Sequence, residues 1–332
     1  MRTLTAVSDR FELMEVQRAP GAPSFASEVI EGLRSSPKRL PSKFLYDDVG
    51  SALFDAITQL PEYYLTRAET EILRDWGWQI VRVLEAPLDF LELGSGSAVK
   101  TRLLIGEALR VQDKLRYVPI DISKEALRSS SLALVDAFAG LSIRAYAGDY
   151  FDVLAHKGLR RELDRKVLAM FMGSNIGNYE PDEASRLLSL LGRVLRPGDG
   201  LLLGTDLKKD RATLELAYDD PVGVTAAFDR NVLARINRDL GADFDPRNFA
   251  HVVRYDEERG AVCSFLEARA AATVEMRGAT VAFAAGERLQ TESSYKFSDD
   301  DVAALGTQAG FTLKTTWHDR ARRFSVHLLV RS

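Results

Sequence analysis

Apolar runs and amphipathic segments alternate regularly between residues 88 and 206 of this chain. Five runs have the length and composition of buried strands: 88–93, 115–121, 141–149, 166–174 and 201–206. Three of the intervals between them have helical periodicity: 98–112, 123–138 and 181–195. This alternation predicts right-handed crossovers and a doubly wound parallel sheet. A ligand is expected at the carboxyl ends of its strands.

The pattern is weaker before this region. Residues 1–40 have no clear period apart from a helix predicted at 24–34, and they carry no candidate chemistry. Thr66 followed by Glu69 forms a capping-box pattern, so a second helix is predicted to begin at Thr66. The apolar face of this helix would be formed by Ile72, Trp76, Ile80 and Leu84.

The alternation stops after residue 206. Residues 210–240 are predicted to be helical, with Gly241 ending the helix. Residues 261–292 change to short runs typical of antiparallel strands, with a tight turn at Arg277-Gly278, and this block is predicted to be an inserted subdomain. A helix at 298–309 and two strands, "TLKTTWH" and "FSVHLLV", would then return to the edge of the first sheet.

Composition and charge favour a small-molecule partner. The net charge is -4 and basic residues are dispersed, so neither a nucleic-acid nor a membrane surface is indicated. A single cysteine, Cys263, and four scattered histidines offer no metal-ligand spacing. No segment has the roughly 20 apolar residues of a membrane span. We therefore expect a cytoplasmic, monomeric protein without a bound metal.

The segment "LELGSGSAVKT" (91–101) has the context of a nucleotide-binding loop, between a predicted strand and a helix. Gly94 and Gly96 allow the backbone to approach a ligand closely. A dinucleotide fingerprint needs a third glycine where Val99 stands, whereas the carboxylate of Glu92 suits a cation. The loop therefore favours S-adenosylmethionine, which carries a sulfonium, and a dinucleotide remains the alternative.

Acidic residues follow the next two predicted strands. Asp121 could hold ribose hydroxyls, while Asp149 and Tyr150 could bind the adenine amino group and cover the ring. Each acid could equally be a capping residue. Because acids stand at three successive strand ends beside a two-glycine loop, the sequence favours a methyltransferase-type cofactor site.

Three longer motifs are more specific. At "KFLYDDVGSALFDAITQLPEYYLTRAE", "MGSNIGN" and "AYDD" the chain resembles the histidine α-N-methyltransferases of ergothioneine biosynthesis, which trimethylate L-histidine to hercynine with S-adenosylmethionine. The likeness runs from about residue 40 to the C-terminus. It implies a Rossmann-like class I methyltransferase domain at 65–207 and 297–332. A second, α+β substrate-binding domain would comprise 1–64 and 208–296.

The resemblance also implies site residues. The implied cofactor contacts are Gly94, Lys100, Asp121, Asp149 and Tyr150. The implied substrate contacts are Tyr63, Asn178, Tyr218, Glu292 and Ser294, with Tyr46 as the catalytic residue near the amine. Lys100 would pair with the methionine carboxylate, Asn178 and Tyr218 with the substrate carboxylate, and Glu292 and Ser294 with the imidazole. Taken singly, each of these residues also has an ordinary structural role. Phe54 and Trp317 are assigned to the core, although Phe54 could also line the amine pocket.

Two positions depart from the family pattern. Asn175 stands where threonine is usual, and Ser264 stands where a methionine lines the pocket. Because Glu292 is retained, histidine is the expected substrate. The alternatives are an N-methyltransferase for another aromatic amino acid or related amine, a nicotinamide-dependent oxidoreductase, and a non-catalytic small-molecule-binding protein.

Overall fold

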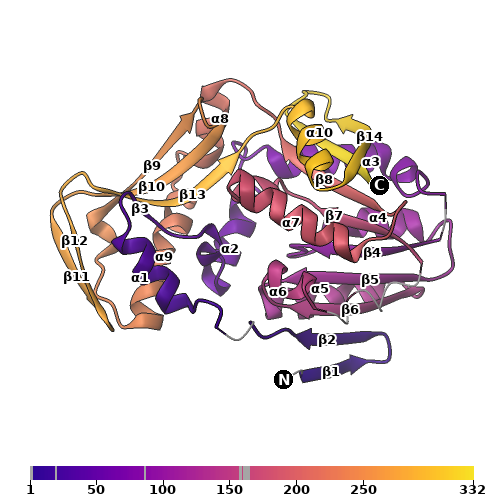
Figure 1. Cartoon of the computed structure of the whole chain (residues 1–332), viewed down its shortest axis with the longest axis horizontal. Coiled ribbons are helices and arrows are strands. Elements are labelled where there is room, and N and C mark those ends of the chain that lie inside the picture. Colours follow the sequence, from indigo (N-terminus) through magenta and orange to yellow (C-terminus); the bar gives the residue numbers. More distant parts are fainter. Residues whose placement is uncertain (1–2, 19–20, 86, 157–158, 160–164) are drawn as a thin grey trace. The chain divides into compact units, whose positions relative to one another are not determined.

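The computed structural model describes residues 3–18, 21–85, 87–156, 159 and 165–332, which form two compact units (Figure 1). The first unit comprises Met1–Pro20, Leu65–Leu207 and Phe297–Ser332. The second comprises Gly21–Tyr64 and Lys208–Lys296. In the described part of the chain no helix combines the length and the apolar character that crossing a membrane requires.

The first unit is built on a nine-stranded sheet of order β1-β2-β6-β5-β4-β7-β8-β15-β14. Its strands are β1 (Thr3–Ser8), β2 (Phe11–Glu15), β4 (Leu88–Leu93), β5 (Leu115–Asp121), β6 (Leu141–Ala147), β7 (Lys166–Phe171), β8 (Gly200–Asp206), β14 (Phe311–His318) and β15 (Phe324–Arg331). Strands β2, β6, β5, β4, β7 and β8 pair in parallel. The β14–β15 hairpin is antiparallel and joins the edge at β8. The predicted doubly wound sheet with a C-terminal hairpin is confirmed.

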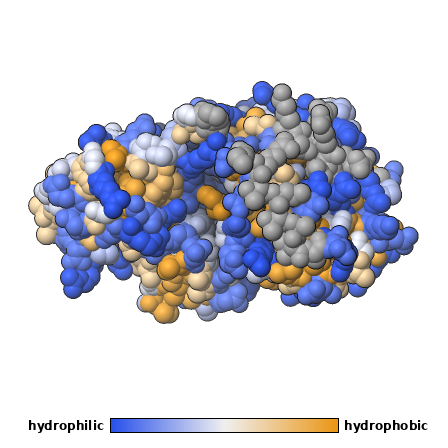
Figure 2. Space-filling view, turned by 90° about the horizontal axis from the view of Figure 1, so that it is seen from below, coloured by the Kyte–Doolittle hydropathy of each residue, from blue (hydrophilic) through white to orange (hydrophobic). Residues whose placement is uncertain are grey.

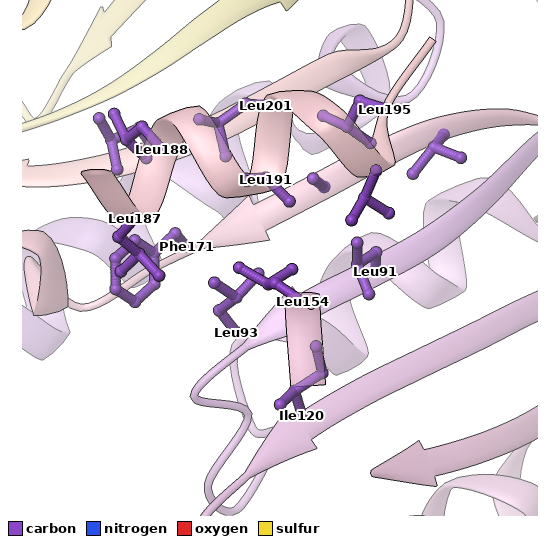
Figure 3. Close-up of a cluster of buried hydrophobic side chains, with 14 of the residues drawn as sticks. Leu91, Leu93, Ile120, Leu154, Phe171, Leu187, Leu188, Leu191, Leu195 and Leu201 are labelled. Carbon is purple, nitrogen blue, oxygen red and sulfur yellow. The ribbon is translucent and has the colours of Figure 1, made fainter. Parts of the chain in front are cut away.

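Helices cover both faces of this sheet. They are α3 (Leu65–Ile80), α4 (Thr101–Ala108), α5 (Lys124–Ala137), α6 (Tyr150–Leu154), α7 (Pro181–Val194) and α10 (Asp299–Gln308). Leucines of α7 pack on alternate residues of the central strands, including Leu91, Leu93 and Phe171 (Figure 3). Alternate residues of a strand point to opposite faces, so Glu92 belongs to the other face. There its carboxylate meets Thr101 of α4.

The N-terminal segment differs from expectation. We placed residues 1–64 together in the substrate-binding domain and saw no period in the first 40, but β1 and β2 extend the large sheet. Phe11, Leu13 and Met14 are buried while Glu12 is half-buried and Glu15 exposed, so β2 has no clear two-residue period that its sequence could reveal. Arg10 fixes the hairpin by donating to the carbonyl oxygens of Val135 and Phe138 at the end of α5.

Helix α3 also departs from its prediction in two details. It begins at Leu65, and the carboxylate of Glu69 binds Gly173 and Lys100 instead of capping the helix N-terminus. Trp76 is 40% exposed, so it does not belong to the buried face. The capping-box interpretation was therefore wrong, although the helix itself was predicted.

The second unit is an α+β structure. Its helices are α1 (Phe25–Arg34), α2 (Asp48–Ile57), α8 (Arg211–Tyr218) and α9 (Val224–Leu240), with short 3-10 turns η1 (Ser42–Leu45) and η4 (Pro246–Asn248). A four-stranded sheet has the order β3-β13-β10-β9, formed by Lys38–Arg39, Arg288–Tyr295, Ala261–Ala268 and Phe249–Asp256. Strands β11 (Ala272–Met276) and β12 (Ala279–Phe283) form a separate hairpin.

One predicted helix of this unit is two helices. The stretch 210–240 is broken because the side chain of Asp220 accepts hydrogen bonds from the backbone N–H groups of Gly223, Val224 and Thr225. These bonds form a turn between α8 and α9 and cap α9. The buried stripe Phe228, Val232, Ile236 and Leu240 and the helix end at Gly241 agree with the prediction. Strand β9 was not predicted.

Polar residues cover most of the face of the molecule drawn in Figure 2, and hydrophobic areas are small and scattered among them.

Candidate functional site

The glycine loop follows β4, at the carboxyl edge of the parallel strands. Gly94 has a φ of +73°, and a Cβ there would lie 2.5 Å from Oη of Tyr150 and 2.9 Å from Nδ2 of Asn175. The loop therefore requires glycine for its backbone angle and for its space. Tyr150 and Asn175, which come from two other loops, converge on it.

Asp121, at the end of β5, is tied to the same loop. Its carboxylate accepts hydrogen bonds from the N–H groups of Gly96 at 2.8 Å and Ser123 at 2.9 Å. Desolvation by the surrounding groups raises its pKa, and these hydrogen bonds oppose the rise. Asp121 thus orders the glycine loop, and a carboxylate accepts about four hydrogen bonds in all.

Asp149 has a structural role as well. It is the N-cap of α6 and accepts a hydrogen bond from the N–H of Phe151 at 2.9 Å. The ring of the following Tyr150 packs edge-on against Phe171, with 5.7 Å between centroids. The short helix therefore fixes the orientation of both predicted residues.

Lys100 and Glu69 form an ion pair in this unit. Lys100 is the N-cap residue of α4, and its Nζ pairs with the fully buried carboxylate of Glu69. Glu69 also accepts from the N–H of Gly173 at 2.9 and 3.0 Å. We did not predict Glu69 as a site residue, because its spacing from Thr66 matched a helix cap.

Glu92 was expected to attract a cationic ligand, and its environment argues against that role. Its carboxylate is buried and accepts hydrogen bonds from Thr101 at 2.6 Å and from the hydroxyl of Tyr117. Burial raises the pKa of Glu92 to about 7. The group therefore serves the packing of α4 on the sheet.

Asn178 ends a 3-10 turn, η3 (Asn175–Asn178), that follows β7. The turn starts after Ser174, which has a φ of +58° and accepts a hydrogen bond from the N–H of Asp206 at 2.9 Å. The side chain of Asn178 is half-buried. The turn thus fixes the position of Asn178 within the first unit.

The second unit contains a chain of aromatic rings. Tyr46 packs against Phe54 and Phe228, with centroid distances of 5.5 and 5.4 Å. Tyr63 lies 6.0 Å from Phe54 and 6.2 Å from Tyr218. The predicted residues Tyr46, Tyr63 and Tyr218 thus lie in one cluster. Phe54, which we assigned to the core, is part of this cluster.

A polar group adjoins these rings. The hydroxyls of Tyr218 and Ser294 lie 2.8 Å apart, and Nζ of Lys296 donates to them at 2.8 and 2.9 Å. Lys296 is only 2% exposed. We did not predict Lys296, although Glu292, Ser294 and Lys296 alternate in sequence and so point to one face.

Glu292 is half-buried and interacts electrostatically with the buried acid Asp229. Burial raises the pKa of Glu292 to about 7, and the charge of Lys296 opposes the rise. Burial likewise raises the pKa of Asp229 to about 7, and Glu292 adds to this rise through charge repulsion. Nε2 of His251, whose side chain is buried, lies 3.6 Å from Asp229. Asp229 and His251 were not predicted.

Ser264 lies opposite Glu292 across the β10–β13 pair. Directly opposed residues project to the same face of a sheet, so a small side chain neighbours the carboxylate. The register shifts between Ser264 and Phe265, and the hydroxyl of Thr291 donates to the Ser264 carbonyl at 3.1 Å. The predicted departure at Ser264 is therefore adjacent to Glu292.

The predicted residues divide between the units. Gly94, Asp121, Asp149 and Tyr150 lie around the glycine loop of the first unit, with Lys100 on α4 and Asn178 after β7. The second unit brings together Tyr46, Tyr63, Tyr218, Glu292 and Ser294. Trp317 is buried in the first unit and donates to Gln79 at 3.0 Å, in line with a core role.

Comparison with known proteins identifies the family. The model of the histidine-specific, S-adenosylmethionine-dependent methyltransferases matches residues 25–331. Histidine N-alpha-methyltransferase of Mycolicibacterium smegmatis is 44% identical over 93% of this chain and 96% of that protein. The protein of the same name from Mycobacterium tuberculosis is 45% identical over 92% of this chain and 94% of its own length.

Two more distant matches were also found. Ergothioneine biosynthesis protein 1 of Schizosaccharomyces pombe is 27% identical over 91% of this chain and 40% of its own length. A solved S-adenosylmethionine-dependent methyltransferase from Clostridium acetobutylicum aligns with 84% of this chain and 98% of that chain, at 11% identity and a TM-score of 0.47. From the family match and the two mycobacterial relatives, the chain belongs to the histidine-specific, S-adenosylmethionine-dependent methyltransferase family.

Proposed function

We propose that this protein methylates the α-amino group of L-histidine with S-adenosylmethionine, through to the trimethylated product hercynine. Family membership supports the reaction, and relatives named for ergothioneine biosynthesis support its place in that pathway. The structural observation that carries the proposal is the arrangement of polar groups on one face of β13. There a carboxylate, Glu292, lies two residues from a hydroxyl, Ser294, that is held by a cation, Lys296.

The first unit fits the cofactor. S-adenosylmethionine presents ribose hydroxyls, an adenine amino group, a carboxylate and two cationic centres. Asp121 and Asp149 supply acceptors at successive strand ends, and Lys100 supplies a cation for the carboxylate. The lack of a side chain at Gly94 lets Tyr150 and Asn175 approach the loop. The ring of Tyr150 stands beside Gly94. Acceptors at two strand ends and a single nearby lysine suit this cofactor better than a pyrophosphate.

The second unit fits an imidazole and an amine. Ionised Glu292 would accept a hydrogen bond from an imidazole N–H, and Ser294 would donate to or accept from the other ring nitrogen. Tyr218 would contact the substrate carboxylate. The ring of Tyr63 would pack on the substrate side chain. Tyrosine faces also favour the quaternary ammonium of the product.

The chemistry requires a neutral amine aligned with the methyl group. The cofactor supplies that methyl group as an electrophile bonded to a sulfonium. An α-amino group titrates near pH 8 in peptides, and the carboxylate of a free amino acid raises this pKa further, so the amine must lose a proton before each transfer. We assign to Tyr46 the orientation of the amine and the passage of its proton towards solvent. Phe54 and Phe228 fix the ring of Tyr46 for this role.

Mass spectrometry of L-histidine incubated with the protein and S-adenosylmethionine tests the proposal. Successive mono-, di- and trimethylated histidine, with release of S-adenosylhomocysteine, is the expected result. Methylation of another aromatic amino acid in preference to histidine would reassign the substrate. Ligand binding without turnover would indicate a binding protein, and calorimetric binding of a nicotinamide dinucleotide would favour the oxidoreductase.

A further inference from the structure

Glu69 is a buried charge that the proposed chemistry does not use. It is 0% exposed, accepts from the N–H of Gly173 and pairs with Lys100. A buried carboxylate is unfavourable unless it is paired and hydrogen-bonded. The partners of Glu69 meet this requirement, and they lie beyond the ends of two different strands, β4 and β7. One carboxylate from α3 therefore links both loops.

Two glycines keep space around this pair. A Cβ on Gly204 of β8 would overlap with Oε1 of Glu69. A Cβ on Gly173 would lie 3.3 Å from Nζ of Lys100, closer than a side chain normally allows. Gly173 also has a φ of +74°. These constraints indicate that the location of the lysine ammonium, and not only its charge, is fixed by the fold.

We infer that Glu69 is a positioning residue for the amino-acid end of S-adenosylmethionine. The inference rests on the proposed function, in which Lys100 pairs with the cofactor carboxylate. Ordering a long lysine side chain costs conformational entropy. Because the ion pair with Glu69 already orders Lys100 in the unliganded protein, cofactor binding loses less entropy. Its hydrogen bond to Gly173 fixes the peptide that follows β7 at the same time.

A simple charge effect would act in the opposite direction. Glu69 is negative and would repel a cofactor carboxylate, so neutralising it would tighten binding if electrostatics alone mattered. In Glu69→Gln, Oε1 can still accept from Gly173, but the amide Nε2 places a donor against the ammonium of Lys100. Lys100 would then leave its position. The sign of the change in affinity therefore separates positioning from charge.

Calorimetry with two ligands tests the inference. S-adenosylhomocysteine carries the carboxylate and ammonium, whereas 5′-methylthioadenosine carries neither. Glu69→Gln is expected to raise the Kd of S-adenosylhomocysteine by about tenfold and to leave that of methylthioadenosine within about twofold. The matched control is Glu107→Gln, which removes a carboxylate of α4 that pairs with Arg110. It should change neither Kd. Unchanged or tighter binding of S-adenosylhomocysteine by Glu69→Gln would overturn the inference.

A double-mutant cycle covers the case in which Glu69→Gln also disturbs the fold. If Glu69 acts through Lys100, adding Glu69→Gln to Lys100→Met should not weaken S-adenosylhomocysteine binding any further. Additive losses of affinity in the double variant would contradict the inference. Methylthioadenosine binding reports whether the adenosine site remains folded in each variant. Neither Kd involves histidine, so failure of histidine methylation would refute the proposed substrate and leave this result standing.

Discussion

Nζ of Lys296 lies 2.8 Å from the hydroxyl oxygen of Tyr218 and above the same ring, 4.5 Å from its centroid. The buried ammonium also donates to Ser294, so one cation holds two hydroxyls that we assign to substrate binding. Both oxygens accept from Lys296, and the two hydroxyls also bond to each other, so one O–H remains to donate to a ligand. Lys296 is therefore expected to fix the direction of this chain of hydroxyls.

Lys296→Met should reduce kcat/KM for histidine by about 10- to 100-fold, because the hydroxyls lose their common donor. Histidine affinity should fall as pH is lowered and Glu292 is protonated, and Lys296→Met should shift this acid limb of the binding profile to higher pH. The charge of Lys296 lowers the pKa of Glu292, so its loss raises that pKa and leaves less carboxylate at neutral pH. Steady-state kinetics measures the loss of kcat/KM, and calorimetry between pH 6 and 9 measures the shift of the acid limb. An unmoved acid limb would show that Lys296 is only a packing residue.

Asp229→Asn should move the same limb in the opposite direction. The charge of Glu292 raises the pKa of Asp229. Charge repulsion acts on both carboxylates, so removing the charge of Asp229 should lower the pKa of Glu292. Glu292 then stays ionised to lower pH, and histidine binding persists there. Arg230 and His251 also face Asp229, and the same titration in Glu292→Gln isolates the contribution of Glu292. If both Lys296→Met and Asp229→Asn shifted the limb in one direction, the assignment to Glu292 would be wrong.

Tyr46→Phe should lower kcat about tenfold or more and change the Kd of histidine less than about twofold. The phenylalanine ring keeps its contacts with Phe54 and Phe228, and only the hydroxyl that we assign to the amine is lost. Single-turnover kinetics and calorimetry separate the two quantities. Tyr295→Phe, which removes a hydroxyl bonded to Arg259 at 2.7 Å in the same unit, is the control. Wild-type turnover in Tyr46→Phe would exclude the role.

The cofactor loop could be predicted from sequence because its features are local. Residues close together in sequence are enough to recognise each feature: the positive φ at Gly94, the acids after consecutive strands and the alternation of apolar runs. The partners of those acids were not predictable. Asp121 binds Gly96, 25 residues away, and Glu69 binds Gly173, 104 residues away. Long-range pairing of this kind leaves no periodic signal in one sequence.

The substrate residues show the same limit. Composition and period indicate only that β13 is a strand, and the resemblance to a family singled out Glu292 and Ser294. Lys296 is on the same face, but a lysine at the end of a strand is usually solvated. Its burial depends on Tyr218 of α8, 78 residues earlier. Strand β2 was missed because its five residues give too few periods to recognise, and the edge strand β9 was missed because its burial does not alternate regularly.

Gly94→Ala should weaken S-adenosylhomocysteine binding more than Gly96→Ala does. Both glycines have positive φ, +73° and +48°, so alanine strains either position by about 1 to 2 kcal/mol. Only at Gly94 does the new Cβ meet Tyr150 and Asn175, whereas nothing lies within 4 Å of a Cβ at Gly96. Comparison of the two variants by calorimetry therefore separates backbone strain from loss of the cofactor surface. Equal losses would indicate strain alone.

Acid should destabilise the first unit through His327. This side chain is 0% exposed, and burial lowers its pKa to about 4 from the ordinary value of 6.5. Its Nε2 lies 2.8 Å from the hydroxyl of Ser325 and 3.0 Å from that of Thr205, and its Nδ1 lies 3.0 Å from Thr316. The neutral imidazole is therefore well accommodated among hydroxyls.

The sign follows from which state binds the proton. Above pH 6.5 the imidazole of His327 is neutral in both the folded and the unfolded state. Between pH 6.5 and about pH 4 it is protonated in the unfolded chain but stays neutral in the folded protein. His327 should thus cost about 2 kcal/mol of unfolding free energy by pH 5 and about 3 kcal/mol by pH 4. In His327→Gln this loss should disappear, because glutamine has no proton to take up. Urea unfolding at pH 7 and pH 5, followed by tryptophan fluorescence, measures the difference, since Trp76, Trp78 and Trp317 all belong to the first unit. An equal loss of stability in wild type and His327→Gln would place the acid sensitivity elsewhere.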